Sequence, residues 1–241
     1  IGTPPDRTSA VTVVVPTFNH AHLIEDCLRG ILNQRFEHGF RAIVYDDAST
    51  DGTQDILRRY VAQHPDRFQA VLERENRLSR GLTPAWFDTL ENPVTPYVTF
   101  CEGDDEWIDE YKLERQWRFM QRNSWCALSH HEVDISAVPE ATDYALALRR
   151  YLRLARPDHE RVAGLALMDG NWIMTCSVMF RSSALPADLI AVVAPRHPQD
   201  FIIFALAAQH GDIGFLPECM ARYRLHGTNF WWTMSPAVGA S

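Results

Sequence analysis

VTVVVPTFN, residues 11–19, is the stretch of sequence that decides the fold. Its first five residues, Val11 to Val15, form an unbroken run of β-branched side chains, which is typical of a parallel strand buried on both faces. Pro16 ends the run, because proline cannot donate a hydrogen bond to a neighbouring strand. The polar residues Thr17 and Asn19 are therefore expected just beyond the carboxyl end of a buried strand.

The chain that follows alternates between helix and strand patterns. Apolar residues recur at helical spacing in some segments, and short apolar runs bounded by turn residues form the others. This alternation predicts an α/β domain with a mostly parallel sheet, flanked by helices and joined by right-handed crossovers. The predicted elements of the first half are helices over residues 20–34, 54–63 and 109–122, and strands over residues 40–45, 68–72 and 97–101.

The second half of the chain is less regular. Its apolar runs predict further strands and its longer periodic segments predict helices, without the strict alternation of the first half. His130 and His131 are adjacent in a predicted strand, so they are expected to point to opposite faces and to be structural. The predicted elements are strands over residues 125–133, 172–180, 213–216 and 220–225, and helices over residues 144–154 and 201–209.

Composition limits the function. The chain has 241 residues with 46% hydrophobic content, enough for one sizeable core, and we expect a single domain over residues 1–241. A net charge of −8 argues against a nucleic-acid partner. No apolar run approaches the roughly 20 residues of a membrane helix and no signal-peptide core is evident, so a cytoplasmic location is expected. Peripheral membrane contact and oligomerisation stay open.

The five cysteines are scattered along the chain and lack the C-x-x-C spacing of a zinc site. Most of them have apolar neighbours, so we expect reduced, largely buried thiols. A catalytic cysteine is the less favoured alternative, since nothing in the sequence marks an activated thiolate.

Acidic residues follow two of the predicted strands. Asp46 and Asp47 come after the second strand, and the segment from Glu102 to Asp105 comes after the fourth. Ligands of a parallel α/β sheet bind outside the carboxyl ends of its strands. A hard divalent cation would relieve the repulsion among these carboxylates, which suggests Mn²⁺ or Mg²⁺. The alternative is a solvated acidic turn that caps the next helix.

Taken in order, the segments VVVPTFN (13–19), DDASTDGT (46–53) and EGDD (102–105) resemble glycosyltransferase family 2, whose members have the GT-A fold, a Rossmann-like α/β arrangement. The likeness extends through Asn76, Arg80 and Gly81 to the later segments 105–116, 198–200 and 223–226. The resemblance implies that about residues 11–135 form the half of the domain that binds the nucleotide-sugar. It also implies that about residues 136–241 form the less regular acceptor-side half and tail.

The resemblance also implies roles for single residues. Pro16, Thr17 and Asn19 would border the nucleoside pocket, with Asp47 on the base and Arg80 nearby. Asp104 and Asp105 stand at the metal and donor-ribose positions, and Glu102 replaces an Asp that is often found at the start of the metal motif. Arg224 and His226 resemble groups that contact the diphosphate, although a surface loop histidine is an equal alternative for His226.

The activity that the resemblance implies is the inverting, metal-dependent transfer of a sugar from a nucleotide diphosphate-sugar, with UDP favoured, to an acceptor hydroxyl. The product would be a polysaccharide, a glycolipid or a glycosylated natural product. Asp200 matches the general base of inverting members and can also cap the helix that follows it. Asp169 and Glu218 are the next carboxylates to consider.

Two other functions compete with this one. A nucleotidyltransferase that makes nucleotide-sugars would need a glycine-rich loop after the first strand, where this chain has Pro-Thr-Phe-Asn-His. A non-catalytic binding module would have no use for Asp200. Acceptor recognition is expected in residues 137–171 and 230–234, and the helix over 144–154 would belong to an acceptor-side or oligomer-forming lobe.

Overall fold

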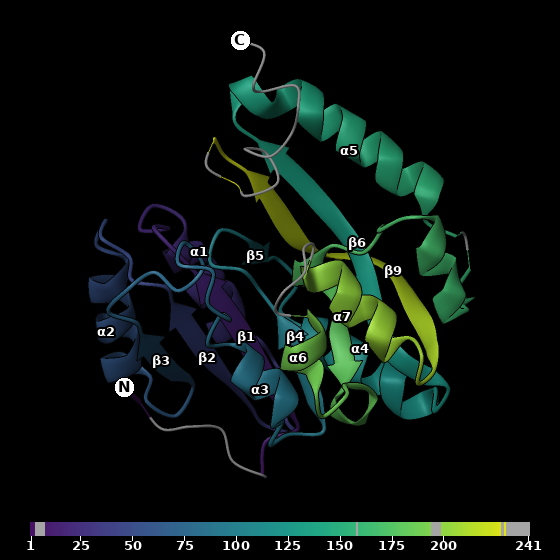
Figure 1. The fold of residues 1–241 in the computed structure, drawn as a ribbon, viewed down its shortest axis with the longest axis horizontal. Helices are drawn as coiled ribbons and strands as arrows, with labels where there is room; N and C mark the ends of the chain where they lie inside the picture. The colour runs from purple at the N-terminus through teal and green to yellow at the C-terminus, as the bar shows by residue number, and fades with distance from the viewer. Residues whose placement is uncertain (3–7, 158, 194–198, 228, 230–241) are drawn as a thin grey trace.

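A nine-stranded mixed sheet organises the computed structural model, which describes residues 1–2, 8–157, 159–193, 199–227 and 229 (Figure 1). Four strands of the first half are parallel to one another, in the order β3-β2-β1-β4. Their bounds are β1 Val11–Thr17, β2 Phe40–Asp46, β3 Phe68–Leu72 and β4 Tyr97–Phe100. The predicted α/β fold with a mostly parallel central sheet is thus confirmed.

Beyond β4 the sheet continues in the order β8-β6-β9-β5, and β7 pairs with β9. All of these strands except the short β5 come from the second half of the chain. β8 is antiparallel to both of its neighbours, whereas β6 and β9 are parallel to each other. The bounds are β5 Glu106–Trp107, β6 Cys126–Ala137, β7 Arg161–Val162, β8 Met179–Arg181 and β9 Asp212–Leu225.

Helices cover both faces of the sheet, and the alternation of side chains along β1 divides the core between them. Val13 and Val15 pack in a cluster with α1, α2 and α4, whereas Val14 packs in a second cluster with α3, α6 and α7. All three valines are fully buried, as the opening run predicts. The bounds are α1 Ile24–Leu32, α2 Thr53–Gln63, α3 Phe87–Glu91, α4 Lys112–Arg122, α6 Leu189–Val193 and α7 Gln199–Ala207.

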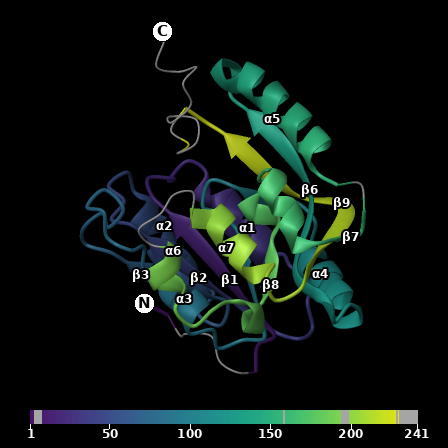
Figure 2. The same cartoon turned by 45° about the vertical axis from the view of Figure 1, so that its right-hand side comes forward.

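The remaining long helix, α5 Thr142–Ala155, lies apart from these two layers (Figures 1 and 2). It crosses the far ends of β6 and β9, where Ala145 packs against Ile135 and Leu225 in a third apolar cluster. The helix therefore packs on two strands of the sheet, and its assignment to an acceptor-side or oligomer-forming lobe stays a prediction. None of the helices that the structure describes is both long and apolar enough to cross a membrane.

Three predictions of secondary structure are wrong. The strand expected over 172–180 is reduced to β8, because residues 175–177 form a 3-10 turn and leave the sheet. The two strands expected over 213–216 and 220–225 are one strand, β9, in which Pro217 and Glu218 form a bulge opposite β6. Proline lacks a backbone donor, so a bulge is where a strand tolerates it. Helix α1 begins only at Ile24, since residues 20–23 form turns.

Candidate active site

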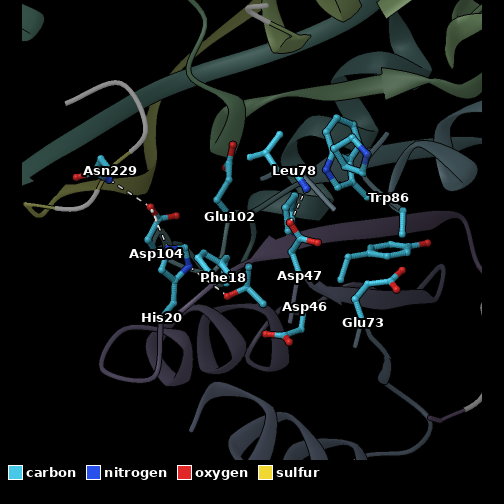
Figure 3. Close-up of a pocket in the computed structure, with 15 residues that line it drawn as sticks. Phe18, His20, Asp46, Asp47, Glu73, Leu78, Trp86, Glu102, Asp104 and Asn229 are labelled. Atoms are coloured by element: carbon cyan, nitrogen blue, oxygen red, sulfur yellow. Dashed lines mark hydrogen bonds and ion pairs between the residues drawn. The ribbon is translucent and has the colours of Figure 1, made fainter. Parts of the chain in front are cut away.

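Two cavities open at the carboxyl ends of the parallel strands and meet at three shared residues, Glu102, Asp104 and Asn229. The first cavity, of about 390 Å³, lies over the ends of β1 and β2 (Figure 3). It is also lined by Pro16, Thr17, Phe18, His20, Tyr45, Asp46, Asp47, Glu73, Leu78, Pro84, Ala85 and Trp86. The second, of about 460 Å³, is also lined by Tyr144, Leu148, Leu152, Asn171, Ile173, Met174, Thr175, Asp200 and Tyr223.

A tight contact between β1 and the acidic turn brings the two strand ends together. The amide of Gly103 donates to the carbonyl of Pro16 at 2.9 Å. A Cβ atom at Gly103 would lie only 2.7 Å from Cβ of Thr17 and 2.9 Å from Cδ1 of Ile24. Only glycine therefore fits at this position, and the neighbouring carboxylates are held at the mouth of the first cavity.

Asp104 is the centre of a cluster of polar side chains (Figure 3). Its Oδ2 atom lies 3.1 Å from Nε2 of His226 and 3.7 Å from Nε2 of His20, and it accepts a hydrogen bond of 3.2 Å from Nδ2 of Asn229. Burial raises the pKa of Asp104, but the hydrogen bond from His226 and the nearby His20 together lower it below its usual range. Asp104 is therefore held as a carboxylate.

This cluster has the composition of a metal site. The side chains of His20, Asp104 and His226 each offer one ligand atom, and these atoms lie within 4.8 Å of one another. Two imidazoles and a carboxylate suit a transition metal such as Mn²⁺ better than Mg²⁺, which prefers oxygen ligands. Thr17 Oγ1 lies 3.2 Å from Nδ1 of His20, so the second ring nitrogen of this histidine is also held.

Asp105 and Glu102, the other two residues predicted as ligands, lie outside that cluster. Asp105 is 1% exposed, and its Oδ1 accepts the backbone N–H of Arg224 at 3.0 Å. It is not among the described residues that line either cavity. Glu102 lines both cavities, and burial, followed by the charge of Asp104, raises the pKa of Glu102 to about 8. Burial thus favours the protonated form of Glu102.

Arg224 joins the last strand to the first helix. Its guanidinium donates to the carbonyls of Asp104 and Leu23, at 2.5 and 2.8 Å, and to the carboxylate of Asp26 at 2.8 Å. It is not one of the described residues that line the cavities, and its role as a diphosphate contact stays a prediction. Arg80, which was expected near the nucleotide, is exposed, pairs with Glu75 and is not among the described residues that line the first cavity.

The residues predicted for the nucleoside pocket take two kinds of position. Pro16 and Thr17 line the first cavity directly. Asn19 instead holds two loops together, because its Oδ1 accepts the N–H of Thr50 at 2.8 Å. Its backbone φ is positive, at 56°. Asp47 lines the cavity and also holds a neighbouring loop. Its carboxylate oxygens accept hydrogen bonds from the backbone N–H groups of Arg77 and Leu78, at 2.6 and 3.1 Å.

Asp200 lies on the second cavity, in the first turn of α7. Burial raises the pKa of Asp200, and the N–H of Phe201 partly offsets this rise. The carboxylates of Asp169 and Glu218 are elsewhere: Asp169 is exposed, and Glu218 lies 3.8 Å from Arg115. Neither is among the described residues that line this cavity. Residues 230–234, expected to take part in acceptor recognition, lie outside the described residues.

The sequence profile of glycosyl transferase family 2 matches residues 12–136, just over half of the chain. The chain belongs to glycosyltransferase family 2. An uncharacterised Mycobacterium tuberculosis protein is 31% identical over 221 residues, which cover 92% of this chain and 60% of that protein. The chain thus spans about three fifths of the length of this curated relative.

Solved structures share the fold of this family-2 chain. Residues 1–349 of TarS from S. aureus, in complex with UDP-GlcNAc, have a TM-score of 0.66 at 16% identity, over 93% of this chain and 61% of that fragment. The mannosyltransferase PcManGT from Pyrobaculum calidifontis, in complex with GDP-Man and Mn²⁺, has a TM-score of 0.61 at 23% identity, over 94% of this chain and 61% of its own. The expected GT-A fold is confirmed by these likenesses.

The family motifs do not mark every residue of the site. His20 follows the motif that ends at Asn19, and its position directly after a strand end was the available signal. Asn229 donates both to the Asp104 carboxylate and to the carbonyl of Arg224, so it joins the acidic turn to the end of β9. Trp86 lies in a loop before α3, a helix without a clear periodic pattern, and was missed with it.

Proposed function

We propose that this chain is the catalytic part of an inverting, metal-dependent glycosyltransferase that transfers a sugar from a nucleotide diphosphate-sugar to an acceptor hydroxyl. The observation that carries the proposal is that two cavities meet at Glu102, Asp104 and Asn229, and that Asp200 lines the second cavity. The first cavity then takes the donor and the second takes the acceptor. The reacting carbon would lie where the cavities join.

The first cavity has the features of a nucleotide pocket. Tyr45 and Trp86 offer aromatic surface to a base, while Thr17 and the carboxylate of Asp47 offer hydrogen-bonding groups. We take the donor to be a UDP-sugar. Its support is the likeness to TarS, whose structures hold UDP and UDP-GlcNAc, although PcManGT holds GDP-Man.

Asp104 and His226, with His20 beside them, would hold the metal ion, and Mn²⁺ fits this set of ligands better than Mg²⁺. Asp105 then supports the site from behind, through the backbone of Arg224. When bound, the ion would supply positive charge that stabilises the departing diphosphate. His226 and Asn229 would keep the Asp104 carboxylate oriented toward the donor.

Asp200 is the proposed general base. Because its pKa is raised by burial, it is a stronger base than an exposed aspartate. It would take the proton of the acceptor hydroxyl as the acceptor oxygen bonds to the anomeric carbon. The bond from that carbon to the diphosphate breaks on the opposite face, so the configuration inverts. The walls of the second cavity, among them Leu148 and Ile173, would limit the entry of water.

Binding and turnover of a panel of nucleotide-sugars test the proposal. We expect one donor to bind by calorimetry with Mn²⁺, to lose most of its affinity in EDTA, and to be hydrolysed slowly to sugar and nucleoside diphosphate when acceptor is absent. Binding without any hydrolysis or transfer would indicate a non-catalytic module. Release of pyrophosphate from a nucleoside triphosphate and a sugar phosphate would indicate a nucleotidyltransferase instead.

A further inference from the structure

The outer face of α5 is unusually apolar for a surface helix. Leu146 and Leu154 are 56% and 69% exposed, and Tyr151 is exposed between them. The adjacent 3-10 turn, Gly164–Asp169, adds Leu165 and Met168, which are 81% and 78% exposed. The two segments are neighbours, because the hydroxyl of Tyr151 lies against Gly170 at the end of that turn.

Arginines are interleaved with these apolar side chains. Arg149, Arg150 and Arg153 are exposed on α5, whereas Asp143, in its first turn, is the one acidic residue of the helix. Arg149 also donates to the carbonyl of Ile135, and Arg149 and Arg153 line a groove beside Glu132 and Asp134 of β6. Arg150 is not among the described residues that line this groove. Asp169 is exposed at the end of the 3-10 turn. This basic helix belongs to a chain with a net charge of −8, so the charge is concentrated locally.

We propose that the outer face of α5 and the turn Gly164–Asp169, called the α5 face below, binds the surface of an anionic lipid bilayer. A helix that combines exposed leucines with arginines inserts its apolar side chains at the level of the head groups, while the guanidiniums pair with lipid phosphates. Negative lipids attract such a segment and zwitterionic lipids do not. At 14 residues, α5 would lie along the surface rather than cross it.

The charge of the α5 face selects this partner over a second copy of the chain. In a twofold dimer, the same patch meets itself, so Arg150 and Arg153 would face a second pair of arginines. An anionic bilayer has the complementary charge and also accepts the leucines.

If the proposed function holds, membrane binding through α5 would bring the active site close to the bilayer, because the opposite side of the same helix lines the second cavity. Tyr144, Leu148 and Leu152 of α5 line the second cavity. A molecule docked through the outer face would therefore hold that cavity close to the bilayer, where an acceptor attached to a lipid would be concentrated. The binding itself can be tested without any knowledge of the donor or the acceptor.

Flotation with vesicles tests the proposal on the intact chain. We compare vesicles of pure phosphatidylcholine with vesicles that contain about 30% phosphatidylglycerol, at low and high salt. The wild-type chain should float with the anionic vesicles only, and high salt should weaken its binding. Arg150→Glu/Arg153→Glu should lower the apparent affinity at least about tenfold, and Leu154→Ser should also lower it.

The matched control is Arg74→Glu/Arg122→Glu, which makes the same change of charge at exposed arginines outside the α5 face. It should float like the wild-type chain, and circular dichroism should show that both double variants are folded. Equal loss in the two double variants, or equal binding to neutral vesicles, would overturn the proposal. So would a wild-type dimer in light scattering that Leu154→Ser turns into monomers, with no vesicle binding by either form.

Discussion

Oδ2 of Asp104 lies 3.1 Å from Nε2 of His226, although 122 residues separate the two along the chain. Asp104 follows the central parallel strands, whereas His226 follows the last strand of the sheet. Their contact places a carboxylate and an imidazole at the junction of the two cavities. Several consequences of this geometry can be measured.

Loss of either partner should weaken metal-supported binding of the donor. Asp104→Asn and His226→Gln should each lower the affinity for a nucleoside diphosphate in Mn²⁺ at least about tenfold, since each removes a ligand. Mn²⁺ should act at lower concentration than Mg²⁺, because two ligands are imidazoles. Calorimetry measures both effects.

The control variant is Glu102→Gln, which changes a cavity residue outside the cluster. It should keep the affinity for the nucleoside diphosphate within about threefold. A loss in that variant as large as in Asp104→Asn would add Glu102 to the ligands.

Asp200→Asn should abolish most transfer but keep the fold. Removal of a general base costs about 10²–10⁴-fold in rate, whereas asparagine keeps the size of the side chain and can still accept hydrogen bonds in the first turn of α7. The loss should fall on kcat, with the Kd of the donor unchanged. Asp169→Asn and Glu218→Gln are matched controls, because both carboxylates lie away from the second cavity. Near-normal turnover in Asp200→Asn would assign the base elsewhere.

Gly103→Ala should destabilise the protein by about 1–3 kcal/mol, because its new methyl group would collide with Thr17 and Ile24. Urea denaturation measures the change. The control is Gly227→Ala, where a Cβ atom would meet nothing within 4 Å. If the two variants are equally stable, the close approach of β1 and the acidic turn is not a constraint.

Two buried histidines should make the fold sensitive to acid. Burial lowers the pKa of His130 to about 3 and lowers that of His131 well below its usual range. Each is neutral when folded but binds a proton in the unfolded chain below about pH 6.5, so stability is lost as the pH falls through that value. The loss is about 1.4 kcal/mol per pH unit for each histidine. It continues until the folded pKa is reached.

His130→Phe should remove one of these contributions. The ring of His130 packs against Trp172 and Phe215, so phenylalanine is an acceptable replacement. Between about pH 7.5 and about pH 5, the variant should lose about 2 kcal/mol less free energy of unfolding than the wild-type chain. Urea titrations at the two pH values measure the difference. An identical loss in both proteins would show that His130 does not titrate on unfolding.

The central sheet was predictable because its strands are short, apolar and bounded by turn residues. Val11 to Val15 is buried on both faces, and that alone requires helices on two sides. Residues 172–180 misled the prediction, since Trp172 and Ile173 are buried beside the sheet rather than in it. An apolar run reports burial, but it does not distinguish a strand from a packed 3-10 turn.

The candidate site was predictable where it follows the strand ends and harder to predict where partners are far apart in sequence. Asp104 and Asp200 each line a cavity, and their roles at a donor and an acceptor site stay predictions. Arg224 belongs to a sequence motif that the family resemblance places at the site. Its guanidinium, however, donates hydrogen bonds to Leu23, Asp26 and Asp104. Which partners Arg224 binds depends on which helix packs next to β9. The local sequence pattern does not predict that packing.

Arg224 donates to the carbonyl of Leu23, which lies 201 residues earlier in the chain. During synthesis on a ribosome, the parallel strands can emerge and pair long before this arginine is made. The nascent chain would then hold an acidic turn that has His20 nearby but still lacks His226 and Asn229. Contacts of such long sequence separation form late and slowly. A chain whose synthesis stopped before β9 would have the parallel strands β3-β2-β1-β4. It would lack the strand that pairs with β5, β6 and β7, and it would also lack His226 and Asn229, the partners of Asp104 that follow this strand.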